Sequence, residues 1–234
     1  MSSAMDAPLP SPSPAPPANS GSLPKFGIAV AASTLGVGIQ AATSASRTDN
    51  LRFGFNFFNY SHDFNKDGIT YHGTLHLRSA EVLFDQYIGN VFHISPGLMF
   101  YDGNEGNATA TVPVGQSFTL GGTTYYSDPA NPVNGTGHIA ARKAAPEFLI
   151  GFGNMLPRNH KHFTANFELG VVLQGSPQAT LNLSGNTCTS PGSGCFAAAS
   201  LAGTSVQAEQ DKINKSLSVF KYYPVVRFTI GYSF

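Results

Sequence analysis

Hydrophobic and polar residues alternate with a period of two along much of the chain, most clearly in residues 221–234. Successive side chains of a strand point to opposite faces, so this period predicts a strand with one apolar face. The other face of this segment carries Lys221, Arg227, Thr229 and Ser233. The apolar face is almost entirely aromatic or β-branched and consists of Tyr222, Pro224, Val226, Phe228, Ile230, Tyr232 and Phe234.

The same alternation recurs upstream, and no stripe with a helical period of 3.6 residues accompanies it. Leu51, Phe53, Phe55 and Phe57, for example, share one face of a segment whose other face carries Arg52 and Asn56. The sequence therefore predicts an all-β protein with strands near residues 50–60, 68–84, 91–102, 138–153, 162–175 and 221–234.

The stretch 25–46 is uncharged after Lys25 and has to supply the remaining strands. It imitates a signal peptide or a membrane-spanning helix in length. However, Gly27, Gly36, Gly38 and Gln40 are too many glycines and polar groups for an apolar helix. One long strand would give an odd total, whereas a tight turn at Ser33–Gly36 would give two strands and a total of eight. We favour eight because bacterial barrels normally have an even count.

The expected connections alternate between short ones, near 46–50, 86–90 and 154–161, and long ones, near 61–68, 102–137 and 176–218. Short periplasmic turns and long outer loops are typical of outer-membrane barrels. The composition agrees with this class, because charged residues make up only 11% of the chain while the mean hydropathy is −0.05. We therefore predict an antiparallel transmembrane β-barrel, with a short helix within 197–218 in the last long loop.

In such a barrel, the polar face of each strand points into one narrow lumen. Charged groups in the lumen have to be paired or hydrated. Two interpretations follow: a polar plug of arginine and glutamate side chains, or a narrow path for small solutes. Glu81 joins the set if a β-bulge near Arg78–Ala80 shifts the alternation. Besides Asn56 and Asn166, the predicted lumen network contains Arg52, His72, His76, Arg78, His93, Glu147, Glu168 and Arg227.

Asp63, Asn65 and Asp67, followed by Gly68, match the first half of a calcium-binding loop. The match then fails, because the twelfth position is Thr74 where a bidentate glutamate is needed. An ordinary Asp-Gly turn is the simpler interpretation. Calcium binding at these three residues stays open at this point.

No enzyme motif is recognisable in the chain. Ser61 and His62 are the nearest approach to a nucleophile and base, but neighbouring residues of a strand point to opposite faces. Neither a GxSxG nor an HExxH motif is present. We therefore predict a protein that is not an enzyme and needs no cofactor or metal.

Cys188 and Cys195 flank a short, flexible, closable loop, so a disulfide is expected if the chain is exported. Residues 1–24 are rich in Pro, Ser and Ala and predict a disordered segment before a barrel spanning 25–234. They contain no cleavable signal at the N-terminus, which a mature chain would explain.

Four blocks of the sequence are distinctive: LHLRSAEVLFD at 75–85, FHISPGL at 92–98, LGVVLQGSP at 169–177 and YYPVV at 222–226. They resemble small Gram-negative outer-membrane barrel proteins of the broad OmpA/OmpW-like group. The terminal Phe234 also resembles the signal that the barrel-assembly machinery reads. The resemblance covers about residues 25–234 and implies fold and location, without catalytic residues.

Two functions remain open from the sequence. The first is a structural or surface-interaction barrel of the bacterial outer membrane with a plugged lumen, and the second is a narrow channel for small solutes or hydrophobic ligands. The expected partners are outer-membrane lipid, lipopolysaccharide and the assembly machinery, and a monomer is expected. Lys+Arg 13 balances Asp+Glu 13, so no basic surface for nucleic acid is predicted.

Overall fold

The computed structural model describes residues 25–157 and 161–234. The segment predicted for residues 1–24 therefore lies outside the described residues. Within the described ranges the protein consists mainly of strands, which form two sheets. No helix in these ranges is both long and apolar enough to cross a membrane.

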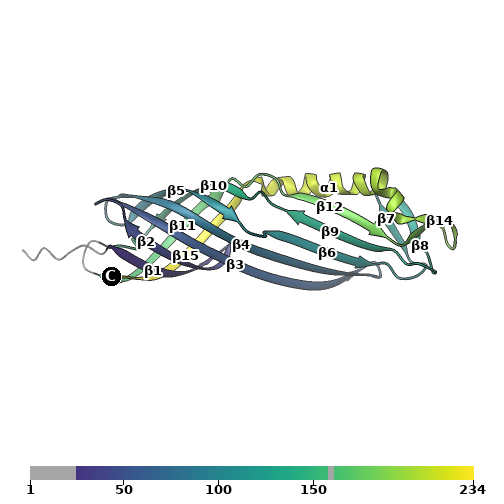
Figure 1. Cartoon of the computed structure of the whole chain (residues 1–234), viewed down its shortest axis with the longest axis horizontal. Helices are drawn as coiled ribbons and strands as arrows, with labels where there is room; N and C mark the ends of the chain where they lie inside the picture. Colours follow the sequence, from purple (N-terminus) through teal and green to yellow (C-terminus); the bar gives the residue numbers. More distant parts are fainter. Residues whose placement is uncertain (1–24, 158–160) are drawn as a thin grey trace, which may run out of the picture.

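Eight antiparallel strands form a closed ring (Figure 1). Each pairs with the next, and the last pairs with the first. The predicted eight-stranded barrel is confirmed, as is the hairpin within 25–46. The strands of the ring are β1 (Phe26–Ser33), β2 (Gly36–Ser44), β3 (Asp49–Lys66), β4 (Ile69–Ile88), β5 (Phe92–Tyr101), β10 (Ala144–Phe152), β11 (Phe163–Val172) and β15 (Tyr223–Ser233).

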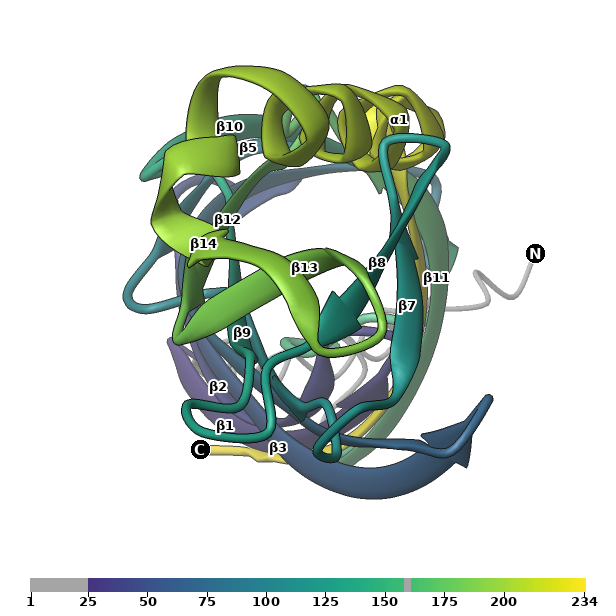
Figure 2. The same cartoon turned by 90° about the vertical axis from the view of Figure 1, so that its right-hand side faces the viewer.

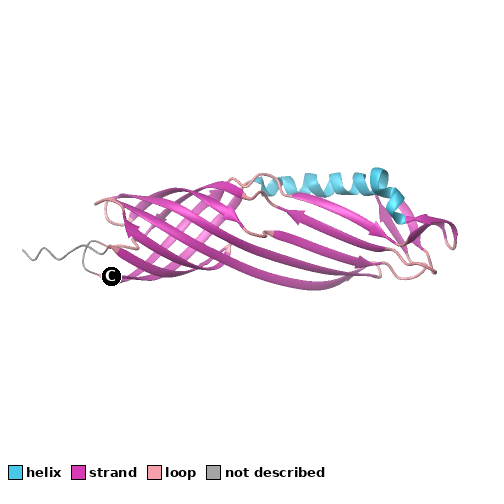
Figure 3. Cartoon of the chain, in the orientation of Figure 1, coloured by secondary structure: helices cyan, strands magenta, loops and turns pink. Residues whose placement is uncertain are grey.

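Beyond one end of the ring, the sheet continues as an extension, which lies at the right in Figure 3. β4 exchanges its partner β5 for β6 (Glu105–Thr111), which pairs with β9 (Asn134–Ala140) and then β12 (Gln178–Ser184). A second sheet covers the far end and contains β7 (Ser117–Leu120), β8 (Thr123–Ser127), β13 (Asn186–Ser190) and β14 (Ser193–Ala197).

The chain then forms the helical turns η1 (Ala198–Leu201) and η2 (Ala202–Val206). These lead into α1 (Gln207–Leu217) and η3 (Ser218–Lys221), which return along the extension to the ring (Figure 1). The predicted helix in the last long outer segment is confirmed.

The long loop predicted near 61–68 is wrong, because β3 and β4 simply continue past the ring. Their pairing runs without interruption from Asp49 opposite Gln86 to Lys66 opposite Ile69. Asp67 and Gly68 form the turn, with φ angles of 53° and 78°. Positive φ at both central residues is the conformation of a type I′ turn, one of the two common two-residue hairpin turns.

The β-bulge predicted near Arg78–Ala80 is also wrong. The pairings of β4 with β3 and β5 keep one register through this point, so the odd-numbered residues of β4 face inward along its whole length. What changes is polarity: the inward positions are Glu81 and Asp85 inside the ring, but Leu75 and Leu77 beyond it. The apolar face of β4 thus points outward in the ring and inward in the extension.

The outer surface of the ring is strongly apolar, with exposed residues such as Val30, Ile39, Phe55 and Phe228. Aromatic side chains gather where the described chain begins and ends. Phe26 stacks on Phe234, and Tyr232 contacts both Phe234 and Phe163, with ring centroids 5.0 to 6.3 Å apart. An apolar band with an aromatic girdle is the surface that a transmembrane barrel presents to lipid.

Candidate functional site

The middle of the lumen is occupied by a charged cluster around two buried arginines. Arg52, on β3, donates to Glu168 on β11 through both terminal nitrogens, Nη1 over 2.8 Å, and its Nη2 lies 2.8 Å from Asp85 Oδ1 on β4. Ser95 donates to the same Asp85 oxygen over 2.6 Å, and His93 Nε2 lies 3.2 Å from Glu168 Oε1. The planar guanidinium group therefore bridges two carboxylates from opposite sides of the ring.

Arg227, on β15, forms the second half of the cluster with Glu81 on β4. Arg227 Nη2 donates to Glu81 Oε2 over 2.6 Å and lies 3.7 Å from Glu147 Oε1. Gln40 and Asn56 donate to the two Glu81 oxygens over 3.1 and 3.3 Å. Charge-assisted hydrogen bonds of this kind offset the cost of burying ionised groups.

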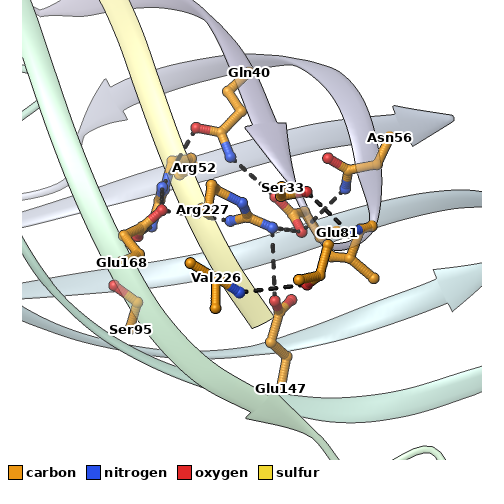
Figure 4. Close-up of polar contacts among 12 residues, drawn as sticks. Ser33, Gln40, Arg52, Asn56, Glu81, Ser95, Glu147, Glu168, Val226 and Arg227 are labelled. Carbon is orange, nitrogen blue, oxygen red and sulfur yellow. Dashed lines mark hydrogen bonds and ion pairs between the residues drawn. The ribbon is translucent and has the colours of Figure 1, made fainter. Parts of the chain in front are cut away.

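Further contacts join the two halves of the cluster (Figure 4). Arg227 Nη1 lies 3.5 Å from Glu168 Oε2, and Arg52 Nη1 donates to Gln40 Oε1 over 3.4 Å. These four side chains are almost completely buried. The cluster is therefore one continuous network across the ring.

Glycines on neighbouring strands make room for the long charged side chains. A Cβ on Gly54 would lie 2.7 Å from Cγ of Glu81, the residue paired with it on β4. A Cβ on Gly151 would lie 2.8 Å from Glu168 Cγ and 2.7 Å from His93 Nε2. The side chains of Glu81 and Glu168 therefore fit into the lumen because Gly54 and Gly151 carry no side chain beside them.

An apolar layer closes the lumen on the side of the extension. The short turn between β1 and β2 folds over the opening, held by Thr34, which donates to Pro224 O and accepts from the Tyr223 hydroxyl. This turn places Leu35 inside the ring. The layer consists of Leu35, Leu83, Met99, Tyr101, Ala145, Leu149, Val172 and Val225, with Tyr223 packed against it.

A third layer closes the opposite end of the ring. The segment after β10 turns inward, so that Met155 and Leu156 are buried against Ala29 and Ala42. Asn154 accepts a hydrogen bond from the Leu156 backbone and one from the Asn50 side chain. The predicted periplasmic connection near 154–161 thus contributes side chains to the lumen, which alternation could not show because this segment is not a strand.

The structure places Arg52, His93, Glu147, Glu168 and Arg227 together in the lumen, as the sequence predicts. It also places Asn56, Asn166 and Glu81 there.

The prediction is wrong for His72, His76 and Arg78, which lie on β4 in the extension, with Arg78 and His72 side chains 59% and 54% exposed. Their face is the outer one because the polarity of β4 reverses at the rim of the ring. His72 instead contacts Asp63, and His76 Nδ1 lies 3.0 Å from Asn59 Oδ1.

Sequence reasoning missed three further members of the network, namely Gln40, Asp85 and Ser95. Asp85 could have been predicted from the sequence, because it lies four residues after Glu81 on the same strand and therefore on the same face. The predicted strand ended at residue 84, just before Asp85, whereas β4 continues to Ile88.

Two of the three possible calcium ligands are engaged in contacts across the β3–β4 hairpin. Asp63 and Asn65 bond across the hairpin to His72 and Thr70, while Asp67 lies in the turn. Among the described residues, the one group that meets metal-ligand distances is Asp128 with Cys188 and Cys195. Those two cysteines form a disulfide between the paired strands β13 and β14, so their sulfurs are not free to bind a metal.

Ser61 and His62 lie on β3 beyond the ring, on opposite faces of the strand. His62 stacks between the rings of Tyr60 and Phe64, with ring centroids 6.2 and 6.4 Å away.

Together these features define a transmembrane β-barrel fold of eight strands, with a charged network inside and a sheet-and-helix extension at one end. Solved structures that share this fold include two from Acinetobacter baumannii. CarO of Acinetobacter baumannii is 20% identical, with a TM-score of 0.54, covering 91% of this chain and 98% of that one. CarO2 of the same organism is 19% identical, with a TM-score of 0.56, covering 92% and 100%. No family model and no curated protein sequence matches the chain.

Proposed function

We propose that this protein is an integral outer-membrane barrel with a sealed lumen, and that its role is structural or depends on surface interactions made by the extension. The observation that carries the proposal is the filling of the ring by three consecutive layers of buried side chains. An eight-stranded ring is about wide enough for its own side chains to fill.

The outer-membrane location rests on the apolar belt and the aromatic girdle, together with the fold shared with CarO. In this location lipid covers the belt and the extension projects outward, where lipopolysaccharide surrounds its base. The expected contact with the barrel-assembly machinery uses β15, which carries Phe234 next to its end and closes the ring against β1. We also propose that the protein acts as a monomer.

Planar-bilayer recording tests the sealed lumen. The purified full-length protein is expected to show no stable openings, and Glu168→Ala and Arg227→Ala variants serve as probes of the charged layer. Openings of the unaltered protein whose size or selectivity changes in either variant would contradict the sealed lumen. A pore-forming barrel protein recorded in the same bilayers provides the positive control.

The alternative function is a narrow channel for small solutes or hydrophobic ligands, and one observation favours it. Among the described residues, several buried polar atoms of the cluster have no hydrogen-bond partner, including Arg227 Nε, Asn166 Oδ1 and both carboxylate oxygens of Glu147. Buried polar groups usually bond to protein or water, so these atoms favour some hydration of the charged layer. The recordings above separate a hydrated plug from a conducting path.

A further inference from the structure

The extension encloses a cavity of about 670 Å³ that the sealed ring does not use. Its walls come from β4, β6, β9 and β12 on one side and from β7 and the η2–α1 segment on the other. Figure 2 views the extension end-on, with α1 across the top and β7 and β8 at the right, facing β9 and β12. A volume of this size is typical of sites for drug-sized small molecules.

Most positions that face this cavity carry apolar side chains or are glycines. The strand β4 contributes Ile69 and Tyr71, and the inward positions of β6, β9 and β12 carry no polar side chain. They are Ala108, Ala110, Gly135, Gly137, Leu181 and Leu183, and Val112, Val206 and Ile213 also line the cavity. This lining differs from the middle of the lumen, where the inward positions of the same β4 strand include Glu81 and Asp85.

The small residues of β6 and β9 keep the cavity open. Ala108, Ala110, Gly135 and Gly137 occupy the inward positions of the two central strands, where a packed core would carry valine or leucine. Protein interiors are normally filled to crystal-like density, and each empty volume costs stability. A Cβ on Gly135 or Gly137 would lie 3.3 Å from Cδ2 of Leu183 or Leu181, so the two glycines make room for these leucines. None of the four small residues fills the cavity that they line.

A row of exposed aromatic rings leads from the rim of the ring to this cavity. Phe58, Tyr60, His62 and Phe64 follow one another on the inner face of β3, each ring 6.2 to 6.4 Å from the next. Phe64 then stacks on Tyr71, a residue of the cavity wall, over 5.0 Å. These rings form an aromatic ladder, with about half of each Tyr60 and Phe64 side chain exposed.

Charged groups near the cavity lie at its edge. Lys66 and Asp67 belong to the tip of the β3–β4 hairpin, and Glu209 is paired with Lys212 and accepts from the Gly121 backbone. An ionised ligand would thus lose its hydration without gaining a buried partner inside. An uncharged ligand loses little hydration and gains both the apolar wall and ring stacking.

We propose that the concave face of the extension is a binding site for an uncharged, elongated aromatic or apolar small molecule, held in the cavity and contacted by the aromatic ladder. The site goes beyond the proposed function and does not depend on it, since the cavity lies outside the ring and would be present whether or not the lumen conducts.

The test uses the absence of tryptophan from this chain. A Phe118→Trp substitution in the cavity wall supplies a single fluorescence donor in the full-length protein, reconstituted in dimyristoylphosphatidylcholine vesicles. The probe is N-phenyl-1-naphthylamine, an uncharged aromatic acceptor. We expect energy transfer to saturate with the probe, in contrast to the non-saturating background that partition into lipid gives.

Two variants in the Phe118→Trp background probe the two parts of the site. Ala108→Leu with Ala110→Leu fills the cavity and is expected to weaken binding at least tenfold. Phe64→Ser shortens the aromatic ladder at a half-exposed position and is expected to weaken binding about threefold or more. Thr180→Leu is the matched control, because its side chain is exposed on the outer face of β12, next to Leu181 of the wall.

Saturable transfer that weakens in both test variants and stays within twofold in the control supports the site. Non-saturating transfer, or equal affinity in all variants, overturns it. Folding of each variant is checked by heat-modifiable migration on gels. If the filled variant does not fold, unchanged affinity in Phe64→Ser is sufficient to overturn the proposal.

Discussion

At the residue scale, the buried and the exposed arginines of this protein differ in the carboxylates that surround them. Arg52 and Arg78 both lie in alternating segments, yet Arg52 is 1% exposed and Arg78 is 59% exposed. Glu168 and Asp85 surround Arg52, whereas Arg78 has only a 3.8 Å contact with the exposed Asp102. A guanidinium group can leave water only where its lost hydration is replaced by charged acceptors.

Removing Arg52 should therefore be costly. Arg52→Ala leaves Glu168 and Asp85 buried without their shared cation, and we expect the free energy of unfolding to fall by about 3–5 kcal/mol. Denaturant unfolding of the protein in lipid vesicles measures the change. The double variant Arg52→Met with Glu168→Gln removes both charges and should recover part of the loss.

The exposed pair of Lys212 and Glu209 provides the control for this prediction. Lys212→Ala should change the free energy of unfolding by less than about 1 kcal/mol, because solvent screens an exposed ion pair. Equal losses in Lys212→Ala and Arg52→Ala would mean that burial of the charges is not the cause.

At the element scale, α1 protects a sheet edge. The strand β12 ends the extended sheet, and its outer edge would leave backbone N–H groups without partners. Gln210 and Asn214, one turn apart on α1, accept hydrogen bonds from the backbone N–H groups of Leu181 and Ala179 over 3.1 and 2.7 Å. Side-chain amides of the helix thus take the place of another strand.

Loss of these amides should expose the edge of β12. In Gln210→Ala with Asn214→Ala, we expect the amides of Ala179 and Leu181 to exchange with deuterium at least tenfold faster, since their acceptors are gone. Hydrogen–deuterium exchange with mass spectrometry measures this. Gln207→Ala is the control, because Gln207 bonds only to Asp211 within the helix. Unchanged exchange in the double variant would show that other contacts protect the edge.

At the scale of the whole molecule, β4 belongs to two environments. In the ring its outward residues, such as Phe84, form part of the apolar belt, while in the extension its outward residues are polar, as at Thr74 and His76. The reversal coincides with the exchange of β5 for β6 as the partner of β4. We infer that the lipid boundary lies at this level.

A matched pair of substitutions on one face of β4 tests that boundary. Phe84→Arg places a charge in the apolar belt and should lower the free energy of unfolding by about 2–4 kcal/mol in lipid vesicles. Thr74→Arg, on the same face in the extension, should change it by less than about 1 kcal/mol because water hydrates the new charge. Comparable losses at the two positions would place Thr74 in lipid as well.

The sequence alone determined the alternation of the ring strands, because a side-chain period of two is a local property of the backbone. The total of eight was favoured by the even count of bacterial barrels, and the structure decided it. The sequence also indicated Arg52, Glu168 and Arg227 as lumen residues, since their neighbours on each strand are strongly apolar. The same alternation holds at His72, His76 and Arg78, so the sequence pattern predicted a lumen position for these three residues as well, and that prediction is wrong.

Only the tertiary structure decided which face points inward at each level. A period of two assigns the residues of β4 to two faces, but it does not tell whether lipid or water lies outside the sheet. The exchange of the apolar and polar faces beyond Arg78 could therefore not be predicted from the sequence pattern. The sheets of the outer segments depend likewise on pairings between distant residues, such as Glu105 with Ala140. Such long-range pairing decides that the strands of the extension surround a cavity, while those of the ring surround a charged network.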